Sequence, residues 1–204
     1  MEETTLKKQT EQLFSAFFAR YPQCAPLRGE AERAAAAIAA VRLPNKVMTC
    51  GNGGSCADAG HIVGELMKTF RLRRAAEAAP PFPALEEAIP AVELGGSGAL
   101  ATAVQNDIGA EWVFAQQVYG LGTAGDVLIA LSTSGNSQNV LRAAETARAK
   151  GIFTVAFTGR GGGKLSACCD VLLNVPAEET FAVQELHLPL YHLLCAAAES
   201  ERWG

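Results

Sequence analysis

Residues 126–151, DVLIALSTSGNSQNVLRAAETARAKG, contain the pattern that decides the fold. The apolar run 127–131 has the length and composition of a buried strand, and the stretch after the turn places apolar side chains at helical spacing. Lys150 and Gly151 are typical of a helix C-terminus. We therefore predict a strand, a polar turn over 132–137, and a helix.

The same order of strand, turn and helix occurs upstream. KVMTC (46–50) reads as a short buried strand, GNGGS (51–55) as a glycine-rich turn, and CADAGHIVGELMKTF (56–70) as a helix. Further apolar runs that read as strands are AVEL (91–94), FTVAFTG (153–159) and DVLLNVP (170–176). Apolar strands that alternate with helices indicate an α/β fold, with a parallel sheet covered by helices on both faces.

Helical spacing predicts the remaining elements. Two helices, 3–21 and 29–43, precede the first strand and are separated by the breaker YPQCAPLRG. Two more are expected around 98–107 and 110–121, and the chain closes with a helix over 181–200. We expect one globular unit, made of an N-terminal helical segment (1–42) and an α/β domain (43–204). Residues 71–90, rich in Ala and Pro, read as a loop with room for one short helix.

Composition limits the classes of function. The chain has 204 residues, of which 49% are hydrophobic, and a net charge of −4, so no overall basic field would attract nucleic acid. No apolar run approaches the roughly 18 residues of a membrane span, and the start lacks the order of a signal peptide. We expect a cytoplasmic protein.

The 6 cysteines form no CxxC pair and read as reduced core residues, with a reactive role as the alternative.

The turn 132–137 has the composition of an anion site. The N-terminus of the following helix offers unpaired N–H groups, and hydroxyl donors surround the same point at Ser132, Thr133, Ser134 and Ser137. The alternative is that these residues merely cap the helix. Neither turn matches a P-loop or the dinucleotide fingerprint, so a sugar phosphate fits better than a nucleotide. Its hydroxyls would reach Asn52 from the neighbouring turn.

The chain has 3 histidines. His61 and Glu65 share one helix face and could hold a metal or act on a substrate, although a surface pair is the alternative. On the last helix Gln184 and His187 are neighbours by periodicity, whereas Gln184 and His192 are separated by about 12 Å of axial rise. Spacing alone does not choose between His187 and His192, and either could be a core residue.

Taken together, CGNGGSCADAGHIVGEL, QNDIG, ALSTSGNSQNVLRAAETARAKG and VQELHLPLYHLL resemble the sugar isomerase (SIS) family, specifically the phosphoheptose isomerases. The resemblance covers about residues 40–200 in order. It implies a flavodoxin-like three-layer α/β sandwich, a homotetramer with active sites at subunit interfaces, and a bound zinc.

The resemblance also implies roles for single residues. Zinc would be held by His61, Glu65, Gln184 and His192, which leaves His187 as a structural residue. The sugar phosphate would be bound by Asn52, Gly53, Gly54, Ser55, Asn106, Asp107, Ser132, Thr133, Ser134, Ser137 and Gln184. The catalytic residues would be Glu65 and His192.

The implied reaction interconverts sedoheptulose 7-phosphate and D-glycero-D-manno-heptose 7-phosphate through an enediol, as the first step of activated heptose biosynthesis. Which of Glu65 and His192 is the base stays open, as does whether zinc is catalytic or structural. Relatives typically carry an Arg where this chain has Thr69, and the link 71–90 is longer than expected. An isomerase of another sugar phosphate is therefore an alternative, and so is a non-catalytic SIS tetramer that binds a sugar phosphate or a protein partner.

Overall fold

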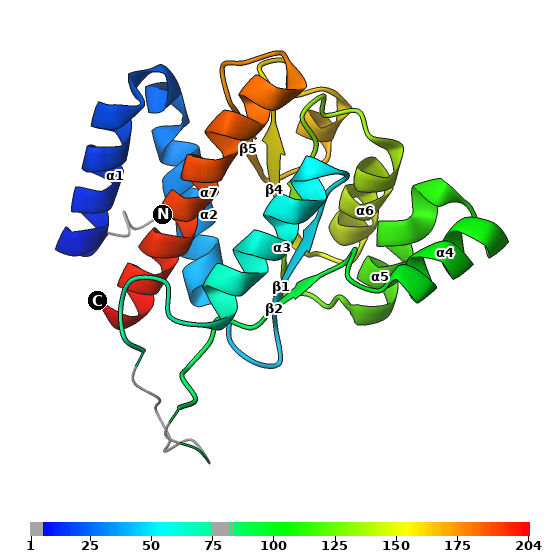
Figure 1. Cartoon of the computed structure of the whole chain (residues 1–204), viewed down its shortest axis with the longest axis horizontal. Helices are drawn as coiled ribbons and strands as arrows, with labels where there is room; N and C mark the ends of the chain where they lie inside the picture. Colours follow the sequence, from blue (N-terminus) through cyan, green and yellow to red (C-terminus); the bar gives the residue numbers. More distant parts are fainter. Residues whose placement is uncertain (1–5, 75–81, 83) are drawn as a thin grey trace.

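The computed structural model describes residues 6–74, 82 and 84–204, which form a parallel sheet flanked by helices (Figure 1). The strands are β1 Val47–Cys50, β2 Ala91–Glu93, β3 Val127–Leu131, β4 Phe153–Thr158 and β5 Val171–Asn174. Their order is β2-β1-β3-β4-β5, with every neighbouring pair parallel. This is the flavodoxin-like order, so the predicted fold class is confirmed.

The helices follow the predicted pattern with small differences. They are α1 Lys8–Arg20, α2 Arg28–Ala40, α3 Gly54–Met67, α4 Gly98–Asp107, α5 Val113–Leu121, α6 Gln138–Ala149 and α7 Thr180–Trp203, with 3₁₀ turns η1 Pro22–Leu27, η2 Ala110–Trp112 and η3 Lys164–Ala167. The predicted break between the first two helices is a 3₁₀ turn, because Pro22 at its first position has a fixed φ that suits it. The last helix continues past Ser200 to Trp203.

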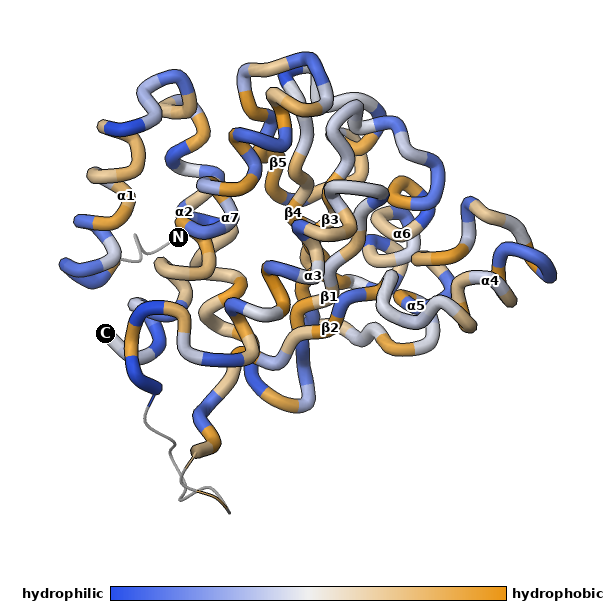
Figure 2. Tube along the Cα trace, in the orientation of Figure 1, coloured by the Kyte–Doolittle hydropathy of each residue, from blue (hydrophilic) through white to orange (hydrophobic). Residues whose placement is uncertain are grey.

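The sheet separates two apolar clusters. On β3, Val127, Ile129 and Leu131 pack in the cluster that contains α1, α2, α3 and α7. Leu128 and Ala130 pack in the cluster of α4, α5 and α6 on the other face. The two groups of helices lie on opposite sides of the sheet in Figure 1, and β1 and β5 are coloured as largely hydrophobic in Figure 2. Burial on both faces explains why the strands have continuous apolar sequences.

The N-terminal helices share the cluster of α7. Phe14 and Phe18 of α1 and Ile38 of α2 are buried together with Leu190 and Leu194. The division into segments 1–42 and 43–204 stays a prediction. The short helix considered for 71–90 falls partly on residues 75–81 and 83, which lie outside the described residues. Among the described residues, no helix is both long and apolar enough to cross a membrane.

The direction in which successive strands are added to the sheet changes at the β1–β3 pair. From β1 it passes through α3 to β2 at one edge, and from β3 through α6 to β4 on the other side. The connections after β1 and β3 therefore lead to opposite faces of the sheet. Adjacent parallel strands whose connections diverge in this way leave a crevice at their carboxyl ends, where ligands of open α/β sheets bind.

A buried ion pair joins α7 to the end of α3. Glu199 and Arg74 have fully buried side chains, with the Glu199 Oε1 atom 2.9 Å from Arg74 Nε. Glu199 also accepts hydrogen bonds from the backbone N–H groups of residues 70–72. Arg74 donates to the carbonyl oxygens of Glu65 and Leu66 at 2.8 and 2.6 Å. The pair thus fixes the chain that leaves α3 and binds the last carbonyls of that helix.

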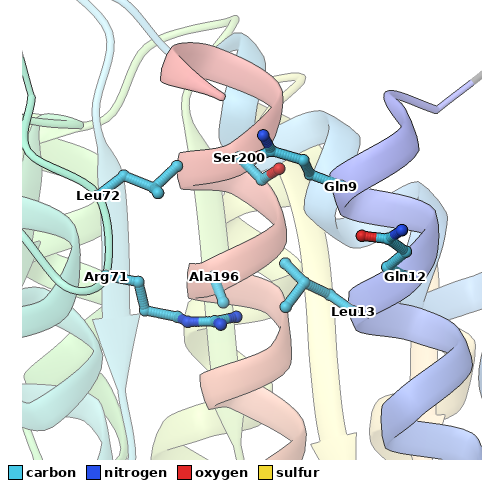
Figure 3. Close-up of a pocket in the computed structure, with 7 residues that line it drawn as sticks. All are labelled: Gln9, Gln12, Leu13, Arg71, Leu72, Ala196 and Ser200. Atoms are coloured by element: carbon cyan, nitrogen blue, oxygen red, sulfur yellow. The ribbon is translucent and has the colours of Figure 1, made fainter.

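Arg71 and Leu72, in the chain that leaves α3, border a cavity of about 400 Å³ between α1 and α7 (Figure 3). Arg71, whose N–H is held by Glu199, extends its side chain across α7 toward Ala196 and Leu13. Gln9 and Gln12 line the opposite side from α1. This cavity contains none of the predicted site residues.

We predict that Glu199→Gln lowers the free energy of unfolding by about 3–5 kcal/mol, because it leaves the buried Arg74 without a counter-charge. Denaturant unfolding measures this change. The matched control is Glu145→Gln, which breaks an exposed pair with Arg142 and should cost about 0–1 kcal/mol. Equal effects of the two variants would contradict the structural role of the buried pair.

Candidate active site

A cavity of about 350 Å³ lies at the crevice between β1 and β3. The turn after β1 and the turn after β3 form its walls, and the start of α7 closes it. Its lining residues are Asn52, Gly53, Gly54, Ser55, Leu131, Ser132, Thr133, Ser137, Thr180 and Gln184. Most of the residues predicted to bind a sugar phosphate thus lie together, although they come from three separate parts of the sequence.

Two helix N-termini open into this cavity. Helix α3 begins at Gly54 and α6 begins at Gln138, directly after the turn 132–137. Gly53 has a φ of 55°, a left-handed conformation that glycine adopts readily and that lets the turn lead directly into α3. The N–H groups of Ser55 and Cys56 are bound by the turn carbonyls of Asn52 and Gly53, but the positive ends of two helix dipoles act on one point, which suits an anion. No lysine or arginine is among the described residues that line the cavity.

Hydroxyl groups complete this anion cavity. Ser55 and Ser132 are buried, and the Ser132 and Ser137 Oγ atoms are 3.0 Å apart. The Ser134 Oγ instead accepts the N–H of Asn136 at 3.1 Å, and Ser134 is not among the lining residues. The arrangement can donate several hydrogen bonds to a phosphate group.

Sequence reasoning missed Asn139 and Thr180. The side-chain amides of Asn52 and Asn139 hydrogen-bond to each other in both directions, at 2.9 and 2.8 Å. Asn139 Oδ1 also accepts the N–H of Val140, which fixes the orientation of the amide. Asn139 follows the polar turn directly, so its position was visible, but its pairing with the distant Asn52 was not. Thr180 reaches the cavity from the start of α7.

Asn106 and Asp107 lie at the C-terminal end of α4 and are exposed. The Asn106 Nδ2 donates to Asp107 Oδ1 at 2.8 Å. They line neither the anion cavity nor a neighbouring cavity of about 600 Å³ that contains Asn52, Glu111 and Arg142. Their role in substrate binding stays a prediction.

The second cluster of predicted residues lies further along α3 and α7, away from the N-termini of these helices. The Nε2 atom of His61 is 3.1 Å from Glu65 Oε1 and 3.5 Å from His192 Nε2. One ligand atom from each of these three residues can be chosen so that all lie within 4.8 Å of one another. Two imidazoles and a carboxylate are a typical donor set for zinc, with a position left for a further ligand.

A hydrogen-bond chain orients His61 for metal binding. Tyr191 donates its hydroxyl hydrogen to Asp58 Oδ1 at 3.2 Å, and its oxygen lies 2.9 Å from His61 Nδ1. With its hydrogen directed at Asp58, the Tyr191 oxygen accepts from Nδ1–H of His61. The Nε2 lone pair of His61 then faces Glu65 and His192. Such outer hydrogen bonds select the tautomer of a metal-binding histidine, so these residues fit a divalent cation.

The charge state of His192 suits the same role. Burial lowers the pKa of His192, the neighbouring His61 lowers it further, and Glu65 opposes both effects. His192 is therefore a neutral imidazole at pH 7, the form that binds metals. On the other side of the cluster, Lys68 Nζ lies 3.3 Å from Glu65 Oε2. Thr69 donates its N–H to Glu86 Oε2 at 3.0 Å.

Gln184 does not join this cluster within the chain. It lines the anion cavity, where its Nε2 is 3.5 Å from Ser55 Oγ. The eight residues from Gln184 to His192 correspond to about 12 Å along α7, and Ser55 and Glu65 are about 15 Å apart along α3. The anion cavity and the metal cluster of one chain are therefore separated by more than two helical turns.

His187 lies in the core. Its side chain is fully buried, and its Nε2 donates to the carbonyl oxygen of Thr158 at the end of β4. Burial lowers the pKa of His187 to about 4. A neutral histidine that ties α7 to the sheet is consistent with a structural residue.

Comparison with known proteins shows the family to which the chain belongs. The SIS domain model matches residues 24–159. The chain is 43% identical over 182 residues to the phosphoheptose isomerase of Rhodospirillum rubrum, and the match covers 89% of each chain. The chain belongs to the phosphoheptose isomerase family. A phosphoheptose isomerase of Akkermansia muciniphila is also 43% identical, over 78% of each chain.

Solved structures of phosphoheptose isomerases have the same fold. The enzyme from Neisseria gonorrhoeae superposes with a TM-score of 0.76 at 36% identity, covering 96% of this chain and 100% of that one. The enzyme from Francisella tularensis gives a TM-score of 0.75 at 32% identity, over 94% and 96% of the two chains. The similarity thus extends over the whole fold, including the N-terminal helices.

We predict that Tyr191→Phe weakens the binding of Zn²⁺ by about 10- to 100-fold, because it removes the hydrogen bond that orients His61. Competition with a chelating dye of known affinity measures the change. The control is Tyr119→Phe, since Tyr119 is an exposed residue on α5. Unchanged affinity in Tyr191→Phe would mean that the hydroxyl does not set the tautomer of His61.

Proposed function

We propose that this protein interconverts sedoheptulose 7-phosphate and D-glycero-D-manno-heptose 7-phosphate, the first step of activated heptose biosynthesis. Membership of the phosphoheptose isomerase family supports an aldose–ketose isomerase. The observation that carries the proposal is that one chain has both an anion cavity, formed by the turns after β1 and β3 and the start of α7, and a cluster of a carboxylate and two imidazoles on α3 and α7. A sugar phosphate isomerase needs both a phosphate site and groups that move protons.

The reaction transfers a proton between C1 and C2 of the sugar through an enediol. Glu65 and His192 are the proposed catalytic residues, because a partly buried carboxylate and a neutral imidazole can each accept a proton. One of them takes the proton from carbon, and the other exchanges a proton with the sugar oxygens. The anion cavity holds the phosphate so that these carbons stay in a fixed place.

Zinc is the proposed cofactor, held by His61, Glu65 and His192. When bound, it supplies a Lewis acid that favours negative charge on a sugar oxygen. Gln184 is proposed as the fourth ligand, contributed by a second copy of the chain, because the Gln184 of the same chain is about 12 Å along the helix from His192.

A homotetramer is proposed for the same reason. The anion cavity and the metal cluster are too far apart along α3 to be bridged easily by one heptose phosphate within a chain, so neighbouring copies would complete each site. Phe181 and Leu188 of α7 have exposed fractions of 62% and 41% and flank the proposed site residues, as an interface requires. The exposed face of α3 includes Ala57 and Gly60, which permit close packing.

We place the protein in the cytoplasm, because its proposed substrate is a phosphorylated sugar that does not cross membranes unaided. Nucleic acid and membranes are not proposed as partners. The net charge of −4 gives no general attraction to either polyanionic surface.

We predict that the protein converts sedoheptulose 7-phosphate to an aldoheptose 7-phosphate, and that Glu65→Gln and His192→Ala each lower the rate by about 10²- to 10⁴-fold. Product analysis with and without a chelator measures the conversion. Glu145→Gln, exposed on α6, is the control and should retain full activity. Phosphate binding without conversion by the folded, zinc-loaded protein would instead favour a different sugar or the non-catalytic SIS tetramer.

We also predict that the native protein is a tetramer with about one zinc per chain. Leu188→Glu should yield smaller species, because it puts a charge on the proposed interface. Light scattering with elemental analysis measures both properties. Leu43→Glu, in a loop and 80% exposed, serves as the control and should stay tetrameric. A metal-free monomer of the wild-type chain would contradict both the oligomer and the shared site.

A further inference from the structure

The turn after β3 is backed by the glycine-rich connection after β4. We name residues 132–137 the phosphate loop and residues 159–163 the backing loop. The N–H of Gly159 donates to the carbonyl oxygen of Thr133 at 2.8 Å. Just beyond the backing loop, Leu165 N–H donates to the Gly135 carbonyl at 3.0 Å, and Lys164 N–H donates to Asn136 Oδ1 at 3.1 Å.

These hydrogen bonds determine which way the peptide groups of the phosphate loop point. A carbonyl oxygen that faced the cavity would repel a phosphate, whereas an N–H would attract it. The carbonyls of Thr133 and Gly135 are both bound by the backing side, so they point away from the ligand. No described residue accepts a hydrogen bond from the N–H of Thr133 or of Ser134. Thr133 lines the anion cavity, so its N–H stays available for a ligand.

The two loops are in contact at glycines. A Cβ added to Gly163 would lie 2.5 Å from the carbonyl oxygen of Ser134 and 2.6 Å from the carbonyl carbon of Gly135. A Cβ at Gly159 would lie 2.9 Å from the carbonyl oxygen of Thr133. At Gly163 the opposing atoms are all backbone atoms of the phosphate loop, so a side chain there would have to displace that loop. At Gly159 the added Cβ would also meet the carbonyl oxygen of Ala177 at 2.8 Å and the side chain of Val183 at 2.9 Å.

We propose that Gly163 and Gly159 are positioning residues of the phosphate site. By allowing the backing loop to lie against the phosphate loop, they hold its carbonyls outward and its N–H groups inward. The inference rests on the proposed function in that it takes the anion cavity as the place where the substrate phosphate binds. It adds to that function a part of the chain that does not itself line the cavity.

Neighbouring glycines separate this effect from general strain. Gly161 has no atom within 4 Å of an added Cβ and no positive φ, so Gly161→Ala tests the added methyl group alone. Gly162 has a φ of 68°, close to the 58° of Gly163, but its added Cβ would meet the side chains of Leu172 and Ser166. Gly162→Ala therefore also puts a side chain at a positive φ, while its Cβ does not press on the phosphate loop.

The experiment measures the dissociation constant of inorganic phosphate by calorimetry, with KM and kcat for sedoheptulose 7-phosphate and denaturant unfolding. We expect Gly163→Ala to weaken phosphate binding by about 10- to 100-fold, as for one or two misaligned hydrogen bonds to a charged group. KM should rise in parallel, while kcat changes by less than about threefold. Gly161→Ala and Gly162→Ala should bind phosphate as the wild type does, although Gly162→Ala should unfold more easily.

Three results would overturn the inference: wild-type affinity in Gly163→Ala, an equal loss in Gly162→Ala, or a wild-type chain that binds no phosphate. If Gly163→Ala does not fold, Gly159→Ala is measured in its place with the same expected result. It has no positive φ, and because its Cβ presses on Ala177 and Val183 as well as on Thr133, its unfolding is compared with that of Gly162→Ala. If the wild type binds phosphate and Gly163→Ala weakens this binding, but the sugar is not converted, the positioning role holds and the isomerase assignment fails.

Discussion

The pairing of β1 with β3 is the contact on which the rest of the site depends. These adjacent parallel strands send their connections to opposite faces of the sheet, so α3 and α6 both begin at the same crevice. Backbone N–H groups that would otherwise need caps or water then face a common ligand position. The apolar clusters on both faces hold these strands in register, and the anion cavity follows from that arrangement without any cationic side chain.

The metal cluster depends on a different contact, the packing of α3 against α7. His61 and Glu65 come from one helix and His192 from the other, and Tyr191 and Asp58 link the same two helices through hydrogen bonds. Further along, Glu199 and Arg74 fix the end of α3 to α7. The helix pair is thus tied on both sides of the cluster, which limits how far the ligand atoms can separate.

The sequence predicts most of the fold, because the central strands β1, β3 and β4 are buried on both faces and most helices have an apolar stripe. It also predicts that the two turns meet, since the carboxyl ends of parallel strands share one edge of the sheet. What it cannot supply are pairings between distant residues, such as Asn52 with Asn139 or Glu199 with Arg74. The family resemblance predicts Gln184 both as a zinc ligand and as a sugar phosphate-binding residue, and the structure shows that within one chain it lines the anion cavity.

The absence of lysine and arginine from the described lining of the anion cavity has a consequence for the evolution of the family. Peptide N–H groups are present whatever side chain a residue carries, proline excepted. A site built from them cannot be lost by a single change of charge, as a lysine-based site can. Mutation can alter it mainly by moving the backbone, so sequence drift should be tolerated at many lining positions and resisted where the path of the chain itself would change.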